Sequence, residues 1–214
     1  MSKLTKAKSS QLQGRLLEEY ADAKCELDYD TPFHLLVAVV LSAQTTDVSV
    51  NKVTPALFKA APDAAALAAL SEEEIQDFIR SIGLYKSKAK NIRGLSQKIA
   101  EEYGGEVPGD FEKLTALPGV GRKTANVVLA ECFQVPSIAV DTHVFRLANK
   151  MGLTDADDVL DTELQLQKAI PKENWIKMHH ALIWHGRRVC FARNPNCEGC
   201  CVNDICKRNE REKK

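Results

Sequence analysis

The chain has 214 residues, of which 44% are hydrophobic and 6% aromatic. This length can bury a substantial core in one or two domains, and abundant alanine and leucine favour helices over sheets. The formal net charge is zero, which excludes a uniformly basic, nucleic-acid-binding surface. Residues 172–214 nevertheless carry ten basic and five acidic side chains (net +5), whereas residues 151–170 carry five acidic ones and one lysine (net −4). One basic face can therefore still attract a polyanion.

Export and membrane insertion are not indicated by the sequence. No charged segment leads into an apolar run at the start of the chain, and the longest apolar run, Leu35 to Leu41, is too short to span a bilayer. The seven cysteines of such a chain argue against a disulfide scaffold and for metal ligation. We therefore expect a cytoplasmic protein that does not contact a membrane.

Hydrophobic periodicity predicts helices along most of the chain. We expect the polar residues 1–10 to be disordered or frayed, and Pro55 to bend or interrupt the third helix. The predicted helices cover approximately 11–23, 33–43, a segment around 50–57, 64–70, 72–81, 86–103, 122–132, 142–150, a segment that ends before Pro171, and 175–189. The fold class is thus predicted to be all-α.

Residues 117–121, Leu-Pro-Gly-Val-Gly, place two glycines around one apolar residue directly before the helix predicted at 122–132. Glycine permits positive φ and a close approach of the backbone to a ligand. The N-terminus of a helix favours an anion such as phosphate. The same pattern is also typical of a tight inter-helix turn in which glycine serves packing alone.

Lys123 lies in the first turn of that helix, where the helix dipole and burial both disfavour its ammonium form. A neutral amine can attack a sugar C1′, displace the base and form a Schiff base that permits strand breakage by β-elimination. The plain alternative is an exposed surface lysine. Asp141 precedes the next predicted helix and is expected to cap it. Its second oxygen can assist deprotonation or stabilise positive charge on the sugar.

The segments LPGVGRKTAN and VDTHVFR together resemble the helix-hairpin-helix motif and the catalytic aspartate of the endonuclease III family of DNA glycosylases. The resemblance extends from about Cys25 to Cys206. It implies a two-lobed helix-hairpin-helix glycosylase fold, with DNA in a cleft where the catalytic residues Lys123 and Asp141 meet. The implied domains are a six-helix barrel at 25–135, containing the hairpin at about 110–132, and an iron-sulfur domain formed by 1–24 and 136–214.

The resemblance also implies which residues contact DNA. Gln44 would fill the gap left by an everted nucleotide, and Leu84 would split the base stack. From the residues alone, Gln44 would be an ordinary loop residue and Leu84 a leucine that packs into the core. Lys88, four residues after Leu84, would belong to a basic, solvated helix face. The other predicted DNA contacts are Leu117, Gly119, Val120, Gly121 and Arg122 in the hairpin, and Arg187 and Arg193 near the cysteines.

Cys190, Cys197, Cys200 and Cys206 are separated by six, two and five residues. Four thiolates at this spacing can enclose one metal centre, and the first loop is too long for a zinc knuckle of CxxC pairs. The spacing favours one [4Fe-4S] cluster, as in the family that the chain resembles. We expect this cluster in loop 190–206 to hold basic residues against DNA phosphates, while a redox role stays open.

The remaining candidate ligands are interpreted differently. Cys201 directly follows Cys200 and is a potential wrong ligand, whereas Cys25 and Cys132 are expected to be buried apolar residues. Three histidines in the predicted helix at 175–189 are expected to pack rather than to bind a metal. They are His179, His180 and His185.

The resemblance implies an enzyme of base excision repair, a DNA glycosylase and lyase that acts as a monomer. It would flip an oxidised pyrimidine out of duplex DNA, remove it and cleave at the abasic site. Three alternatives stay open. The first is a monofunctional adenine glycosylase of the same superfamily, which typically has a small hydroxyl residue in place of Lys123. The others are a non-catalytic DNA-binding or redox-sensing module and a zinc-stabilised scaffold.

Overall fold

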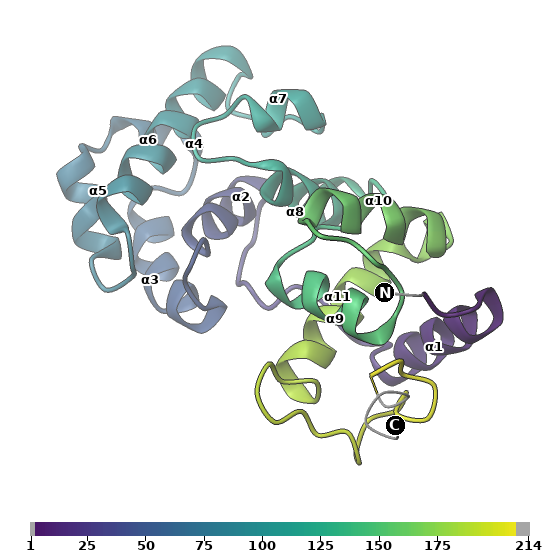
Figure 1. The fold of residues 1–214 in the computed structure, drawn as a ribbon. Coiled ribbons are helices and arrows are strands. Elements are labelled where there is room, and N and C mark those ends of the chain that lie inside the picture. Colours follow the sequence, from purple (N-terminus) through teal and green to yellow (C-terminus); the bar gives the residue numbers. More distant parts are fainter. Residues whose placement is uncertain (1–2, 209–214) are drawn as a thin grey trace. The chain divides into compact units, whose positions relative to one another are not determined.

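The computed structural model describes residues 3–208, which form α-helices, one short 3-10 helix and no strand (Figure 1). The helices are α1 (Lys6–Glu19), α2 (Pro32–Leu41), α3 (Asp47–Ala60), α4 (Ala64–Ala69), α5 (Glu72–Ile79), α6 (Tyr85–Glu102), α7 (Phe111–Thr115), α8 (Arg122–Phe133), α9 (Thr142–Met151), α10 (Val159–Ala169), η1 (Lys172–Asn174) and α11 (Trp175–Arg188). The predicted all-α fold is therefore confirmed. No helix within residues 3–208 is both long enough and apolar enough to cross a bilayer.

The chain divides into two compact units, with boundaries after Cys25 and after Val135. We call residues 26–135, which contain α2 to α8, the central unit. The terminal unit comprises the described residues up to Cys25 and from Pro136 onward, with α1 and α9 to α11.

The core of the terminal unit brings together helices that are far apart in sequence. Leu12 and Leu16 of α1 are fully buried, and α1 contacts α11, which in turn contacts α9. Buried residues of α9 and α11 complete this cluster, among them Leu147 and Leu182. The Trp184 indole N–H donates to the Lys24 carbonyl at 3.2 Å, which ties the segment after α1 to α11. Hydrophobic burial thus holds α1 together with the helices that follow Pro136 in one compact unit.

The central unit is built on α2 and α6. Residues 33–41 of α2 are all buried, and α2 contacts α3, α6 and α8. Helix α6 also contacts α4 and α5, and it buries Ile92, Leu95 and Ile99 completely. A helix that is apolar on all sides must lie inside the fold, as α2 does.

Side-chain caps define where several helices begin. Thr31 accepts a hydrogen bond from the backbone N–H of His34 at 3.1 Å, with Pro32 at the first helical position. Ser71 and Glu74 form a capping box at the start of α5. Such caps typically contribute about 1 kcal/mol each. Because a cap depends on residues only three positions apart, both helix starts could be predicted from the sequence.

Three expectations are wrong. Helix α1 begins at Lys6, with the Thr5 hydroxyl accepting from the Lys8 N–H at 3.4 Å, so residues 6–10 are helical rather than disordered; residues 1–2 lie outside the described part. Helix α3 continues through the exposed Pro55, so the expected interruption is absent, while a bend at Pro55 stays a prediction. Lys88 is only 3% exposed, not solvated, because its side chain turns toward the loop before α3.

Candidate nucleic-acid interface and metal centre

A short hairpin of α7 and α8 carries the glycine-containing turn. Asp110 caps α7 by accepting from the Lys113 N–H at 2.9 Å. Within the turn, the Val120 N–H donates to the Leu117 carbonyl at 3.1 Å. Helix α8 starts after Gly121, which provides no side-chain cap. The first N–H groups of α8 therefore lack a side-chain acceptor from their cap, an arrangement that favours an anion.

Gly119 has two reasons to be glycine. Its φ is +75°, a conformation that side chains rarely adopt, and a Cβ there would lie 2.8 Å from the Cβ of Asn91 on α6. The turn also rests on α6 at Gly94, where an added Cβ would lie 3.3 Å from the Pro118 ring. Lys98 of α6 donates from Nζ to the Ala116 carbonyl at 3.2 Å. The hairpin turn is thus supported directly by α6.

The predicted contact residues of the hairpin divide into two groups. Leu117 and Val120 have buried side chains, 3% and 6% exposed, so they can offer a ligand only their backbone. Gly119, Gly121 and Arg122 are exposed. The Arg122 guanidinium lies 5.1 Å from the centroid of the Phe111 ring, which holds it against α7.

The two candidate catalytic residues each occupy the start of a helix. Lys123 is half-buried in the first turn of α8, in the central unit. Asp141, in the terminal unit, is also half-buried, and its Oδ1 accepts from the Val144 N–H at 2.7 Å. The expected N-cap of α9 is therefore present. This cap uses Oδ1 and does not require Oδ2.

Gln44 and Leu84 share an unusual backbone conformation. Their φ values are +54° and +59°, in the left-handed region that costs a non-glycine residue about 1–2 kcal/mol. Leu84 is 57% exposed and Gln44 is exposed as well. Leu84 therefore does not pack into the core, and that alternative is wrong. Strained residues that are also exposed are characteristic of binding sites.

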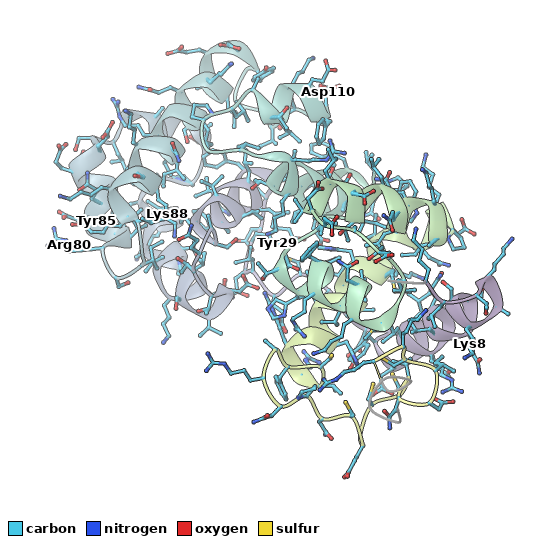
Figure 2. The ribbon with its side chains drawn as sticks, viewed as in Figure 1. Lys8, Tyr29, Arg80, Tyr85, Lys88 and Asp110 are labelled. Atoms are coloured by element: carbon cyan, nitrogen blue, oxygen red, sulfur yellow. The ribbon has the colours of Figure 1, made fainter. Side chains whose placement is uncertain are left out.

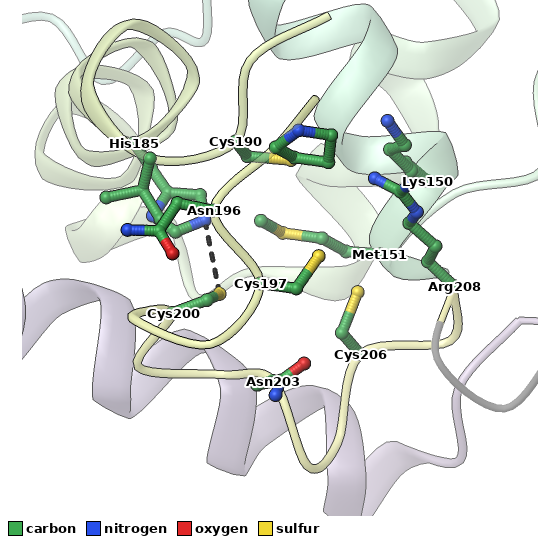
Figure 3. Close-up of a pocket in the computed structure, with 12 residues that line it drawn as sticks. Lys150, Met151, His185, Cys190, Asn196, Cys197, Cys200, Asn203, Cys206 and Arg208 are labelled. Carbon is green, nitrogen blue, oxygen red and sulfur yellow. Dashed lines mark hydrogen bonds between the residues drawn. The ribbon is translucent and has the colours of Figure 1, made fainter. Parts of the chain in front are cut away.

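Four cysteines of the loop after α11 surround one pocket (Figure 3). They are Cys190, Cys197, Cys200 and Cys206, and His185 and Met151 complete much of the lining. Among residues 3–208, no three potential ligands converge closely enough for a single metal ion, so the sulfurs line a space rather than meet at a point. Cys201 is not part of the lining; it packs on the core of the terminal unit, and its carbonyl accepts from Arg15 Nη1 at 3.2 Å.

The chemistry of this pocket fits an iron-sulfur cluster. Burial raises the pKa of the Cys200 thiol to about 11 and also raises the pKa of Cys206. Thiols with such pKa values are neutral at pH 7, and cationic iron centres are what would stabilise them as thiolates. The largely apolar walls then limit the access of water to the centre.

Two residues support the cysteine loop in ways that were not predicted: Arg146, and His185, which is buried as expected and also contacts the loop. Arg146 of α9 donates from Nη1 to the Cys190 carbonyl at 2.6 Å and from Nη2 to the Gly186 carbonyl at 3.4 Å. The Nδ1 atom of His185 is hydrogen-bonded to the Tyr20 hydroxyl at 2.8 Å. Its Nε2 atom lies 3.6 Å from Cys200 Sγ (Figure 3). Burial, aided by the charge of Arg146, lowers the pKa of His185 to about 4 and keeps it neutral. Arg146 stands in the VDTHVFR segment, which was the available signal.

The other two predicted interface arginines lie close to the cysteines. Arg193 is exposed within the loop, and Arg187 is half-buried at the end of α11. Neighbouring Arg188 stacks on Trp184, with its guanidinium 3.5 Å from the ring centroid. Contacts of Arg187 and Arg193 with DNA stay a prediction. His179 and His180 are buried in α11 beside each other, with ring centroids 5.0 Å apart.

Comparison with known proteins agrees with this geometry. Residues 37–172 match the HhH-GPD superfamily of base excision DNA repair proteins, and residues 190–206 match the iron-sulfur binding domain of endonuclease III. Over 188 residues the chain is 52% identical to Endonuclease III of Synechocystis sp., covering 87% of this chain and 86% of that protein. Over 208 residues it is 46% identical to Endonuclease III of Escherichia coli (strain K12), covering 97% of this chain and 99% of that protein.

A solved structure gives the same result. It is a trapped covalent intermediate of endonuclease III with DNA, and it matches with a TM-score of 0.93 and 46% identity, covering 99% of this chain and 100% of that one. The domain matched by the four-cysteine loop shows that the protein holds one [4Fe-4S] cluster, as predicted. The chain belongs to the endonuclease III family, within the HhH-GPD superfamily of base excision DNA repair proteins.

Proposed function

We propose that the protein removes oxidised pyrimidines from duplex DNA and cleaves the strand at the abasic site through a Schiff base on Lys123. Membership of the family makes it a base excision repair DNA glycosylase with AP lyase activity. The proposal adds the lesion class and the residues. One observation carries it: Lys123 stands in the first turn of an uncapped helix, in a chain 46% identical to an enzyme that was trapped covalently on DNA.

In this mechanism the Lys123 amine attacks C1′ of the damaged nucleotide, and the base departs with the electrons of the glycosidic bond. The sugar ring then opens: the C1′–O4′ bond breaks, O4′ takes up a proton, and C1′ and the Lys123 nitrogen form an imine that acidifies the C2′ proton. Loss of that proton moves electrons toward the imine and expels the 3′ phosphate, which breaks the strand. We propose that Asp141 assists through Oδ2, by accepting a proton or by stabilising positive charge on the sugar, while Oδ1 keeps its cap to Val144.

Binding of the duplex would use both backbone and side chains. Gly119 and Gly121 are exposed, and together with the uncapped start of α8 they would offer backbone N–H groups to a phosphate. Gln44 and Leu84 would enter the base stack once the damaged nucleotide is flipped out, since both are exposed and held in strained conformations.

The terminal unit would add basic contacts. Cys190, Cys197, Cys200 and Cys206 would hold the cluster as thiolates, and these bonds would order the loop that carries the exposed Arg193. We propose that Arg187 and Arg193 bind phosphates there. We also propose that the protein acts as a monomer on the nucleoid, in the cytoplasm, where its substrate lies.

The test is borohydride trapping on two duplexes, one with an oxidised thymine and one with an abasic site. We expect the wild type to form a covalent adduct with both, and Lys123→Gln to form none, because an amide cannot make an imine. Visible absorbance of the cluster and the thermal unfolding midpoint should be unchanged, which shows that the variant is folded and loaded.

Two results would contradict this proposal. Release of free base without any adduct would place the protein in the monofunctional branch, with water as the nucleophile. Binding to the duplexes with neither adduct nor base release would leave a DNA-binding module.

A further inference from the structure

Lys88 is an unexpected residue to find buried. It lies in the first turn of α6, beside Tyr85, and only 3% of it is exposed (Figure 2). Lysine is almost never fully buried unless it is paired. No carboxylate of residues 3–208 forms an ion pair with its ammonium group. Its hydrogen-bond partner is a hydroxyl: Nζ donates to Thr45 Oγ1 at 2.6 Å.

The hydroxyl that receives this hydrogen bond belongs to the loop that displays Gln44. Thr45 Oγ1 also donates to the Ala43 carbonyl at 3.5 Å, and the Thr45 N–H donates to the Ser42 carbonyl at 3.0 Å. The ammonium group of Lys88 is therefore bonded to Thr45, and the Thr45 hydroxyl in turn reaches Ala43 on the other side of Gln44, whose own φ is +54°. This contact fixes the loop in the conformation that exposes the Gln44 side chain.

The backbone of Lys88 holds the second exposed residue. Its N–H donates to the Leu84 carbonyl at 3.0 Å, the first hydrogen bond of α6. Leu84 is the N-cap of α6, and its apolar side chain makes no capping hydrogen bond. One residue thus contacts the Leu84 turn through its main chain and the Gln44 loop through its side chain. The two loops are 40 residues apart in sequence, and this is a direct link between them within the central unit.

Burial of Lys88 is a poor way to stabilise the fold. Burial lowers the pKa of its ammonium group, which means that the folded state disfavours the charge. A neutral, apolar side chain of similar length would fill the same space without that penalty. A charged donor has one property that an apolar side chain lacks, namely a short and directional hydrogen bond.

We propose that Lys88 is a positioning residue that locks the Gln44 loop to the Leu84 turn, so that both side chains enter the duplex as one preorganised unit. This inference rests on the proposed roles of Gln44 and Leu84. With the lock in place, the entropy of ordering the loop is lost before DNA binds rather than during base flipping. The lock should therefore matter most when a lesion must first be unpaired.

The experiment measures single-turnover base release from an oxidised thymine in two settings, paired opposite adenine and unpaired in a single-nucleotide bulge. The variants, all of the full-length cluster-loaded chain, are Lys88→Met, which removes the donor at similar length, and Thr45→Val, which removes the acceptor. Thr45→Ser keeps the hydroxyl and should restore activity. Lys59→Met is the matched control, an exposed lysine at the far end of α3.

We expect Lys88→Met and Thr45→Val each to slow release from the paired lesion about tenfold, and from the bulged lesion less than about twofold. The double variant should be no slower than either single variant, because both remove the same hydrogen bond. Thr45→Ser and Lys59→Met should behave as the wild type. Thr45→Val makes the test independent of whether Lys88→Met folds.

Two patterns would overturn the inference. One is an equal loss on paired and bulged lesions, which indicates a general structural role. The other is a loss in Lys88→Met with none in Thr45→Val. Leu84→Ala and Gln44→Ala separate this failure from failure of the proposed function: if neither slows release from the paired lesion, the insertion roles themselves are wrong. If they slow it and the Lys88 variants do not, only the lock is wrong.

Discussion

Leu84 and Leu117 both lie in glycine-containing turns that adjoin α6, yet their side chains have opposite fates. Leu84 is 57% exposed with φ +59°, whereas Leu117 is 3% exposed. In the first turn the Leu84 side chain is exposed to solvent, and the left-handed backbone conformation of Leu84 is strained. In the second turn the leucine side chain is buried and anchors the turn, while Gly119 and Gly121 are exposed. The two turns therefore serve the proposed interface in different ways, one by inserting a side chain and the other by offering N–H groups.

The largest expected effect is on stability, and it tests whether the buried Leu117 side chain anchors its turn. Leu117→Ala removes a buried side chain, so the free energy of unfolding should fall by about 2–5 kcal/mol. Thermal unfolding measures it directly. If Leu117 instead contacted DNA through its side chain, the variant would unfold like the wild type and only lose affinity for a duplex with an abasic-site analogue.

A substitution at Gly119 tests whether the backbone of the hairpin turn binds a phosphate. Gly119→Ala introduces a Cβ where φ is +75° and where Asn91 lies 2.8 Å away. We expect a loss of about 1–3 kcal/mol in stability together with weaker binding to the abasic-site duplex, because the turn must change shape. Gly14→Ala is the control, since a Cβ there meets nothing within 4 Å. Unchanged DNA affinity in the Gly119 variant would show that the turn does not hold a phosphate.

Leu84 should show the smallest change in stability. Leu84→Gly relieves a left-handed strain of about 1–2 kcal/mol but loses partial burial and adds about 1 kcal/mol of backbone entropy. The unfolding free energy should therefore stay within about 1 kcal/mol of the wild type, while base release from a paired lesion slows about tenfold. A large drop in stability with normal activity would mean that Leu84 is a packing residue after all.

Short-range patterns explain what could be predicted. The start of α5 depends on Ser71 and Glu74, three residues apart, and the cap of α9 on Asp141 and Val144. Cysteine spacing identified the cluster loop for the same reason, because all four residues belong to one segment. The resemblance of LPGVGRKTAN and VDTHVFR to the endonuclease III family indicated the rest of the proposed site.

Long-range contacts explain which features could not be predicted from the sequence. The fate of Lys88 depends on Thr45, 43 residues away, and the brace of Cys190 depends on Arg146, 44 residues away. A lysine in the first turn of a helix, such as Lys88, is predicted to be solvated unless the fold places a hydrogen-bond acceptor beside it. For the adjacent Cys200 and Cys201, packing decides which side chain lines the pocket. The sequence by itself determined most of the helices, several of their caps and the segment that holds the cysteines of the pocket, since those interactions span a few residues. Only the tertiary structure decided which side chains are buried and which are displayed, because burial depends on neighbours that are distant along the chain.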